Sequence, residues 1–422
     1  MAAYLQAYVD HFGLTPSLKL STTVQSIQRT DDGNWNVTVH PNNNPKQTED
    51  FTFDGLVMCT GGHRVPKNAL KASGVLDKFS GTVLHTVELK SVQKDFVGKR
   101  VLVVGHAVSG CDCSTQLATL GDCKTVVNSV RHAPYHISRV SPVTGKALDD
   151  FFWARLPIWL GRVLPESMNY QGMKGALMAS FPDQLTSDIS PMTPNDDVRM
   201  AGVGYSSGYV DLVKSGKIRV QSGIQSAQGN TVTFTNGHKE DFDVILCATG
   251  FEFDLSSLPQ DVQDKILHRN PYTDKNDCAL YKYTLVPGID NLALLGYYNN
   301  IGEMIPSAEM QARYVTAIWN GKIPRPSPAT IQAGAEAYKN HIETGPHNSS
   351  VVTFGLAELL GDELGVTPSV LQALWNKSKL LTGPLYQVYY RTNPAIDGPE
   401  KAAKAQKRFD YLQANPCKPE GP

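Results

Sequence analysis

A buried strand that leads directly into a glycine-bounded turn is the feature that most restricts how this chain of 422 residues can fold. The apolar run Lys99–Val104 (KRVLVV) suits a strand covered on both faces, and the turn after it reads GHAVSG, from Gly105 to Gly110. A helix is expected next, over Cys111–Leu120, with Gly121 where a C-terminal cap belongs. Strand, glycine turn and helix in this order predict the first half of a dinucleotide-binding βαβ unit.

The turn contains the residue types that phosphate binding needs. Gly105 permits a tight turn, and the N–H groups at the helix start, that of Ser109 among them, attract a pyrophosphate. Gly110 lets helix and strand lie close together. Ala107 stands in the place of the middle glycine, and its methyl group is expected to crowd the cofactor. The alternative is an ordinary strand-to-helix turn, but the βαβ context favours nucleotide binding.

The next predicted strand, Lys124–Ser129, is expected to end beside the ribose of the nucleotide. An NAD site normally has Asp or Glu there, to bind both ribose hydroxyls. This chain has Asn128, Ser129, Val130 and Arg131 instead. Ser129 falls within the predicted site, and Arg131 suits a 2′-phosphate, so the sequence predicts NADPH. The alternative for Arg131 is a solvated surface arginine.

One segment of the sequence occurs twice, with a constant offset of 200 residues. Residues 18–28 (LKLSTTVQSIQ) correspond to residues 218–228 (IRVQSGIQSAQ). Each copy then continues to a Phe-Asp pair, an apolar run and a Thr-Gly turn, which is Thr60-Gly61 in the first copy and Thr249-Gly250 in the second. We interpret the pattern as an internal duplication. The strands predicted in the first copy are Leu18–Leu20, Val24–Ile27 and Trp35–Val39.

The two copies differ in what precedes them. In the second copy, 113 residues separate Gly105 from Ile218. By the same spacing, a glycine turn of the first copy would lie before Met1. We therefore expect two nucleotide sites, the first of which lacks its opening βαβ unit in this sequence, and a helix over the first residues that ends at Gly13.

Composition argues against several classes of protein. Lys and Arg total 39 against 40 Asp and Glu, so no basic excess is available for binding nucleic acid. No apolar run approaches the ~18 residues that a membrane span needs. Seven scattered cysteines and the lack of a signal peptide pattern favour a cytoplasmic protein with reduced thiols. The oligomeric state stays open.

The sequence also raises the question of a metal site and of a hydrolase site. Cys111 and Cys113, with His106 and Cys123 nearby, raise the question of a metal ion. Residues two apart on a helix do not face each other, so structural cysteines and no metal are the preferred interpretation. No serine lies in a G-x-S-x-G elbow, and nothing else favours a hydrolase.

Several further motifs resemble those of one enzyme family. Phe79–His85 (FSGTVLH) fits the signature F-x-G-x-x-x-H, and Cys247–Phe251 (CATGF) is similar to the segment A-T-G-Y. Asn291–Gly296 with Glu309–Arg313 resembles the pair N-L-x-x-x-G and E-x-Q-A-R. The C-terminal pattern is matched by Gly383-Pro384, Tyr390-Arg391 and Gly398-Pro399. Together these motifs resemble the flavin-containing monooxygenases over nearly the whole chain.

The resemblance implies an α/β fold with two dinucleotide-binding, Rossmann-like domains, the NADP domain being inserted in the FAD domain, and a helical C-terminal extension. The implied boundaries are 1–95 for the remaining FAD domain and linker, 96–246 for the NADP domain, 247–330 for the FAD-domain return segment and 331–422 for the extension. FAD and NADPH are the implied cofactors. The implied reaction transfers one oxygen of O2, through a flavin C4a-hydroperoxide, to a soft nitrogen or sulfur nucleophile of a small molecule.

The resemblance also assigns expectations to single residues. NADP is expected to bind at Gly105, Ser109, Gly110 and Arg131. The backbone is expected to approach the cofactors closely at Thr60, Gly61, Thr249 and Gly250. Gln311 is expected near the flavin ring, with Glu309 and Arg313 as supporting positions. His85 either couples the two domains or is a structural linker residue. Because the cofactor carries the hard chemistry, no catalytic residue is assigned beyond the supporting candidates Gln311 and His85.

Three departures from the family pattern leave alternatives open. The FAD-binding G-x-G-x-x-G unit and the active-site Asn of the N-terminal half are not in this sequence. Leu89 stands where the family has Tyr and the related Baeyer–Villiger enzymes have Trp. The alternatives are a Baeyer–Villiger monooxygenase acting on ketones and a truncated, inactive remnant that binds NADP at most. By itself, the polypeptide is expected to carry little flavin.

Overall fold

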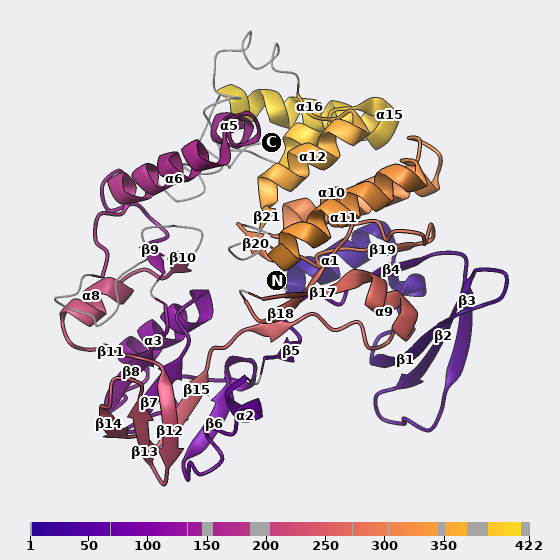
Figure 1. Cartoon of the computed structure of the whole chain (residues 1–422). Helices are drawn as coiled ribbons and strands as arrows, with labels where there is room; N and C mark the ends of the chain where they lie inside the picture. Colours follow the sequence, from indigo (N-terminus) through magenta and orange to yellow (C-terminus); the bar gives the residue numbers. More distant parts are fainter. Residues whose placement is uncertain are drawn as a thin grey trace.

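The computed structural model describes residues 2–67, 69–132, 134–145, 155–185, 203–271, 273–302, 304–344, 351–368 and 387–414. Three parts are visible in Figure 1. A parallel sheet with its helices lies at the lower left, a second α/β unit at the right, and a set of helices from the C-terminal part at the top. The glycine turn belongs to the first of these parts.

A five-stranded sheet organises the middle of the chain, in the order β11-β8-β7-β15-β6. Its strands are Arg219–Gln221 (β11), Thr125–Ser129 (β8), Arg100–Val104 (β7), Val244–Cys247 (β15) and Thr82–His85 (β6). Every neighbouring pair is parallel. The chain runs outward from β7 through β8 to β11 and returns on the other side of β7, which is the order of a doubly wound nucleotide-binding fold. The predicted Rossmann-like architecture is confirmed.

The central strand β7 supplies side chains to two cores, because successive residues of a strand point to opposite faces. Val101 and Val103 lie in one core with residues of α3 (Val108–Leu120) and α8 (Tyr209–Lys214). Leu102 lies in the other, against an antiparallel meander. All three side chains are fully buried, which explains the continuous apolar sequence of this strand. The meander strands are Ile224–Gln228 (β12), Thr231–Phe234 (β13) and Lys239–Asp241 (β14).

The two copies of the repeated segment form similar antiparallel meanders. A second antiparallel meander, formed by Thr22–Arg29 (β1), Trp35–Pro41 (β2) and Glu49–Phe53 (β3), corresponds to β12–β14. The register of the first hairpin shifts between Val24 and Ser26 in one copy and between Ile224 and Ser226 in the other. The same irregularity at an offset of 200 residues supports a common origin for the two copies. The strand predicted at Leu18–Leu20 is wrong, since these residues lie outside any strand.

The first copy is completed by a segment from much later in the chain. Its strand β4 (Leu56–Met58) pairs in parallel with β19 (Leu292–Leu294). Trp35, Met58 and Leu292 share one buried core with α9 (Gln260–Ile266). The predicted N-terminal helix is α1 (Ala2–Phe12), which ends directly before Gly13 and buries none of its residues.

Helices dominate the C-terminal part, as the sequence predicts. The longer ones are Met304–Trp319 (α10), Pro328–Thr344 (α11), Thr353–Leu364 (α12) and Pro399–Ala414 (α16). A buried ion pair of 3.1 Å between Arg155 and Glu358 joins α12 to α5 (Arg155–Val163). None of the helices in the described ranges is long and apolar enough to cross a membrane.

The remaining elements are short apart from one helix of the middle segment. They are Thr15–Ser17 (η1), Val65–Pro66 (β5), Ala69–Ala72 (α2), Thr86–Glu88 (η2), Tyr135–Ile137 (β9), Glu166–Ser180 (α6), Val203–Tyr205 (β10), Phe251–Glu252 (β16), Leu267–Asn270 (β17), Lys275–Cys278 (β18), Asn300–Ile301 (β20), Val351–Val352 (β21), Gln387–Tyr390 (η3) and Pro394–Asp397 (α15). Strand β6 falls in the segment 1–95, yet it is the edge strand of the sheet around β7. The domain boundaries themselves stay predictions.

Candidate functional site

The turn between β7 and α3 requires glycine at both of its ends. Gly105 has φ +110°, and a Cβ added there would overlap the carbonyl oxygen of Ala248. A Cβ on Gly110 would overlap the carbonyl oxygen of Gly105. Only glycine therefore allows the start of α3 to sit this close to β7 and β15.

The N-terminus of α3 is open to an anion. Ala107 is the N-cap residue, and its side chain caps no backbone N–H. Residues 107–109 are exposed, and the first helical hydrogen bond runs from Cys111 N–H to the carbonyl of Ala107, at 3.0 Å. A helix of 13 residues with an uncapped, exposed first turn offers free N–H groups and the positive end of its dipole. This geometry fits a pyrophosphate, as predicted for Ser109 and its neighbours.

The end of β8 has no carboxylate beside this turn. Asn128 is fully buried, and its Nδ2 donates to the carbonyls of Val103 (3.0 Å) and Gly105 (2.8 Å). The hydroxyl of Ser129 is also committed to the protein, since it donates to the carbonyl of Ser222 at 2.8 Å. These two residues shape the strand end.

Arg131 is the charged residue at this strand end. It is exposed, and its aliphatic stem passes Gly223, where an added Cβ would lie 3.3 Å from Cγ of Arg131. No ion pair joins Arg131 to another residue of the described ranges. An exposed guanidinium group that follows β8, without an ion pair among the described residues, fits the position of a 2′-phosphate.

The first Thr-Gly turn leaves room at its glycine. The hydroxyl of Thr60 is hydrogen-bonded to the hydroxyl of Tyr297. Gly61 has φ +74°, and a Cβ added there would meet no atom within 4 Å. The backbone at this position is therefore accessible to a ligand.

The second Thr-Gly turn is bound to the linker between the two units. The hydroxyl of Thr249 donates to the carbonyl of Lys67 at 2.6 Å, and the N–H of Lys67 donates to the carbonyl of Gly250 at 2.9 Å. The same carbonyl accepts a hydrogen bond of 3.1 Å from Nε2 of His85. Two separate stretches of the linker thus converge on this turn.

His85 is buried at the end of β6, and both of its ring nitrogens are engaged. Nδ1 accepts from the N–H of Val87 at 3.2 Å, so the proton lies on Nε2, which faces Gly250. Burial lowers the pKa of His85, although the carbonyl of Gly250 and the charge of Glu88 act in the opposite direction. The arrangement is compatible with both predicted roles, a structural linker residue and a coupling residue.

Gln311 is fully buried in α10, where its amide bonds to protein. The side-chain oxygen accepts from the N–H of Gly296 at 3.0 Å. Its nitrogen donates to the carbonyl of Tyr283 at 2.6 Å and to the hydroxyl of Thr284 at 3.0 Å. Gln311 thus holds the turn after β19, and contact with a flavin ring stays a prediction.

Glu309 and Arg313 fasten the C-terminal segment to α10. Glu309 accepts hydrogen bonds from Gln387, at 2.9 Å, and from Arg391. Arg313 pairs with Asp397 at 2.7 Å. The E-x-Q-A-R motif and the C-terminal motif therefore meet in space. Gly383-Pro384 lies outside the described residues.

Sequence reasoning missed a cationic group beside the second Thr-Gly turn. The Nζ atom of Lys275, at the start of β18, would lie 3.9 Å from a Cβ on Gly250. Burial lowers the pKa of Lys275, partly offset by Asp277. Burial, and then the charge of Lys275, also lowers the pKa of His63, which follows the first Thr-Gly turn. The link between these residues is purely tertiary, so no sequence motif marks it.

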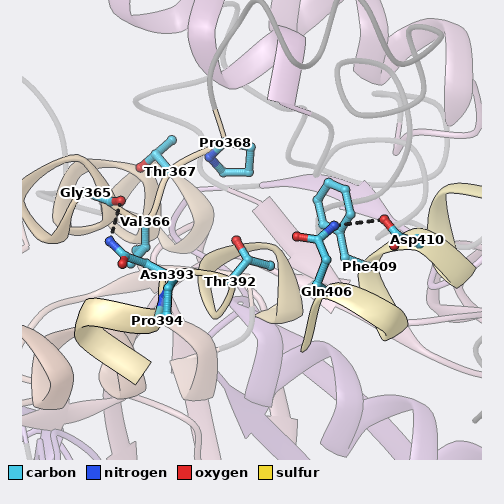
Figure 2. A pocket seen from close by; sticks show the side chains of 10 residues that line it. All are labelled: Gly365, Val366, Thr367, Pro368, Thr392, Asn393, Pro394, Gln406, Phe409 and Asp410. Atoms are coloured by element: carbon cyan, nitrogen blue, oxygen red, sulfur yellow. Dashed lines mark hydrogen bonds between the residues drawn. The ribbon is translucent and has the colours of Figure 1, made fainter. Parts of the chain in front are cut away.

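A pocket of about 290 Å³ lies in the C-terminal part, near the end of α12 and along α16 (Figure 2). Two hydrogen bonds join residues of its lining: Asn393 donates to the carbonyl of Gly365 at 3.1 Å, and Gln406 donates to Asp410, one turn further along α16, at 2.8 Å. None of the residues predicted to bind a cofactor lines it. Its lining is Gly365, Val366, Thr367, Pro368, Thr392, Asn393, Pro394, Gln406, Phe409 and Asp410.

Comparison with known proteins agrees with these observations. The model of a family described as flavin-binding monooxygenase-like matches residues 1–407. Flavin-containing monooxygenase 5 of Rattus norvegicus is 27% identical over 420 residues, covering 96% of this chain and 74% of the relative. Flavin-containing monooxygenase 2 of Homo sapiens is 26% identical over 404 residues, covering 92% of this chain and 72% of the relative.

Two solved structures are similar in fold. S-allyl-L-cysteine S-oxygenase from Allium sativum has a TM-score of 0.56 at 17% identity, covering 97% of this chain and 75% of that one. Cyclohexanone monooxygenase from Rhodococcus sp. Phi1, bound to NADP+, has a TM-score of 0.56 at 16% identity, covering 86% of this chain and 81% of that one. At such identities the likeness concerns the fold alone.

Proposed function

We propose that this chain, which belongs to the flavin-binding monooxygenase-like family of FAD- and NADPH-dependent enzymes, oxygenates a soft nitrogen or sulfur nucleophile with O2 and NADPH. Membership of the family makes it a flavin-dependent monooxygenase. One observation carries the choice of NADPH: Arg131 is exposed at the end of β8, and residues 128–131 include no carboxylate.

The residues present fit the nucleotide. The uncapped first turn of α3 would hold the pyrophosphate through its backbone N–H groups, and Arg131 would bind the 2′-phosphate. A bound NADPH supplies the hydride, and a bound FAD supplies the activation of O2. At Gly61 and Gly250 the backbone is in a positive-φ conformation next to a strand end, which supports a close approach of the cofactors there.

The nature of the acceptor is supported by the relatives. One curated relative, from Rattus norvegicus, is named dimethylaniline monooxygenase (N-oxide-forming) 2, and a structural neighbour is named as an S-oxygenase. Nitrogen and sulfur are both soft nucleophiles. Cyclohexanone monooxygenases are also structural neighbours, so ketones are the alternative substrate class that has to be tested beside nitrogen and sulfur compounds.

Because the polypeptide by itself is expected to carry little flavin, the experiment adds excess FAD to the full chain, measures the bound flavin, and follows NADPH oxidation with a tertiary amine, a thioether and a cyclic ketone. We expect N-oxide or S-oxide to form in step with NADPH consumption. Turnover of the ketone alone would make the chain a Baeyer–Villiger enzyme. A flavin-loaded protein that oxidises NADPH but oxygenates none of the three would contradict the proposed substrate class.

A further inference from the structure

A buried cluster of two imidazoles and a thiol lies under the nucleotide turn. His106 belongs to the turn, Cys111 to the first turn of α3, and His136 to β9. One ligand-capable atom from each of the three lies within 4.8 Å of the others. Their exposed fractions are 6%, 0% and 4%, so solvent hardly reaches them. Tyr209 and Asn128, both fully buried, complete the surroundings.

The protonation of His106 follows from its partners. The amide of Asn128 is oriented by its Nδ2, which donates to two backbone carbonyls. Its oxygen therefore faces Nδ1 of His106 and also accepts from the hydroxyl of Tyr209 at 2.8 Å. Because an amide oxygen only accepts, Nδ1 of His106 carries the proton. The lone pair of His106 is then on Nε2.

That lone pair points at a second imidazole. Nε2 of His106 and Nε2 of His136 are 3.2 Å apart, and the two rings are nearly perpendicular. Nδ1 of His136 is buried and has no hydrogen-bond partner among the described residues. If the proton of His136 is on Nε2, an acceptor is left unpaired at Nδ1. If it is on Nδ1, two lone pairs face each other. A cation between the two Nε2 atoms removes this repulsion.

The spacing suits a tetrahedral ion. With metal–nitrogen bonds of about 2.0–2.1 Å, two nitrogens around a tetrahedral ion lie about 3.3 Å apart. The measured 3.2 Å agrees with this. Sulfur and nitrogen ligands lie about 3.6 Å apart in the same geometry. The sulfur of Cys111 therefore has to move about 1 Å closer, away from the carbonyl of His106 to which its S–H donates at 3.7 Å.

We propose that His106, Cys111 and His136 bind one Zn²⁺ ion beneath the nucleotide turn. A set of two imidazoles and one thiolate is typical of zinc and of other borderline or soft ions. Asn128 supplies the second-layer acceptor that metal-bound histidines usually have on their other nitrogen. The site goes beyond the proposed oxygenation, and no step of that reaction uses it.

Binding has a definite proton balance. Burial lowers the pKa of His106 to about 4 and that of His136 to about 3, so both imidazoles are neutral and need lose no proton at neutral pH. Burial raises the pKa of the Cys111 thiol, so the free protein holds it as S–H. When Zn²⁺ binds, the S–H bond breaks, a Zn–S bond forms, and one proton leaves to solvent.

The location gives the ion a mechanical consequence. It would join the turn and the start of α3 to β9. In the free protein the side chain of Gln184 bonds to both backbone groups of His136 and to the carbonyl of Phe181, so it fixes β9 to the segment after α6 and not to the turn. The phosphate-binding N–H groups lie on the exposed side, at residues 107–109. The ion and the nucleotide therefore occupy opposite sides of one turn.

The direct test is a titration of the full chain, stripped of metal, with Co²⁺, which replaces Zn²⁺ and is visible. We expect one Co²⁺ per chain, a thiolate-to-cobalt charge-transfer band and tetrahedral d–d bands, all removed by one equivalent of Zn²⁺. Calorimetry in buffers of different ionisation enthalpy should show one proton released per Zn²⁺. No nucleotide, flavin or turnover enters these readouts, so their failure is distinct from failure of the proposed function.

Matched variants locate the site. Cys111→Ala and His136→Phe should weaken Zn²⁺ binding by at least about 100-fold, since even second-layer partners contribute 10–100-fold. Cys113→Ala, two residues along the same helix, and His132→Phe, on an exposed residue, should leave binding unchanged. A folded wild-type chain without the charge-transfer band would overturn the proposal, whatever the variants do. So would a band that persists in Cys111→Ala.

Discussion

The two copies of the repeated segment differ most at their beginnings. Ile218 and Val220 lie in or next to β11 and are 1% and 8% exposed, whereas the corresponding Leu18 and Leu20 are 44% and 78% exposed and outside any strand. Both runs alternate apolar and polar residues in the same way. The second has β8 to pair with, and the first has no such neighbour among the described residues. A strand needs a partner as well as a pattern.

The ends of the copies show the same contrast. Strand β15 is buried at every position between β7 and β6. Strand β4 pairs with β19 alone within the described ranges, and Val57 is 37% exposed. The two meanders, which share a bulge, depend on local sequence, and they therefore have similar structures in both copies. Burial and close packing depend on the elements around them, so we expect equivalent substitutions to cost more in the second copy.

The largest difference is expected between two positive-φ glycines, Gly105 of the packed turn before α3 and Gly61 of the open first Thr-Gly turn, although the two are not counterparts in the repeat. Gly105→Ala should destabilise the protein by about 3 kcal/mol or more, because a left-handed conformation costs roughly 1–2 kcal/mol and the new Cβ overlaps the carbonyl of Ala248. Gly61→Ala should cost only the conformational part, roughly 1–2 kcal/mol. Urea denaturation of both variants measures the difference. Equal losses would show that the glycine turn before α3 is no more tightly packed than the first Thr-Gly turn.

A smaller difference is expected at the Phe-Asp pairs. Asp243 accepts hydrogen bonds of 2.8 Å from the backbone N–H and from the guanidinium group of Arg100. The hydrogen bond from the Arg100 side chain is the main reason why the pKa of Asp243 falls from 3.8 to about 2. Asp54, its counterpart, is exposed. Asp243→Asn should therefore cost about 1–2 kcal/mol at pH 7, and Asp54→Asn less than about 0.5 kcal/mol.

The pH dependence of unfolding checks the cause. Because the folded pKa of Asp243 is below the unfolded one, its contribution is complete above pH 3.8 and is lost as the pH falls toward 2. The stability difference between wild type and Asp243→Asn should shrink over this range. A difference that stays constant down to pH 2 would assign the loss to packing and not to the ion pair.

The sequence was sufficient for features that depend on neighbouring residues in the chain. The strand, glycine turn and helix from Arg100 to Leu120, the hairpin strands β1 and β2 and the Thr-Gly turns follow from local patterns, whereas the third meander strand, β3, was not predicted. The helix begins at Val108, three residues before the predicted start, because its first turn is part of the glycine turn itself.

Contacts across long sequence separations were beyond such reasoning. In the sequence, the neighbour of Cys111 that suggests a metal is Cys113, which cannot face it on a helix. The residue that meets His106 and Cys111 in space is His136, which lies on β9, the partner strand of β10. In the same way, the E-x-Q-A-R motif resembles a flavin-side element, but Glu309 and Arg313 bind the C-terminal segment. In each case the partner is chosen by the fold of a distant segment, for which the local sequence has no signal.

The central claim is that the turn before α3 and Arg131 together bind NADPH, and calorimetric titration with NADPH and NADH tests it most directly. Arg131→Ala removes a charge-assisted interaction of about 1.5–3 kcal/mol, so NADPH should bind roughly 10- to 100-fold more weakly while NADH is almost unaffected. Arg139→Ala, at another exposed arginine of the same unit, should change neither. Equal losses for both nucleotides, or no loss for either, would contradict the account.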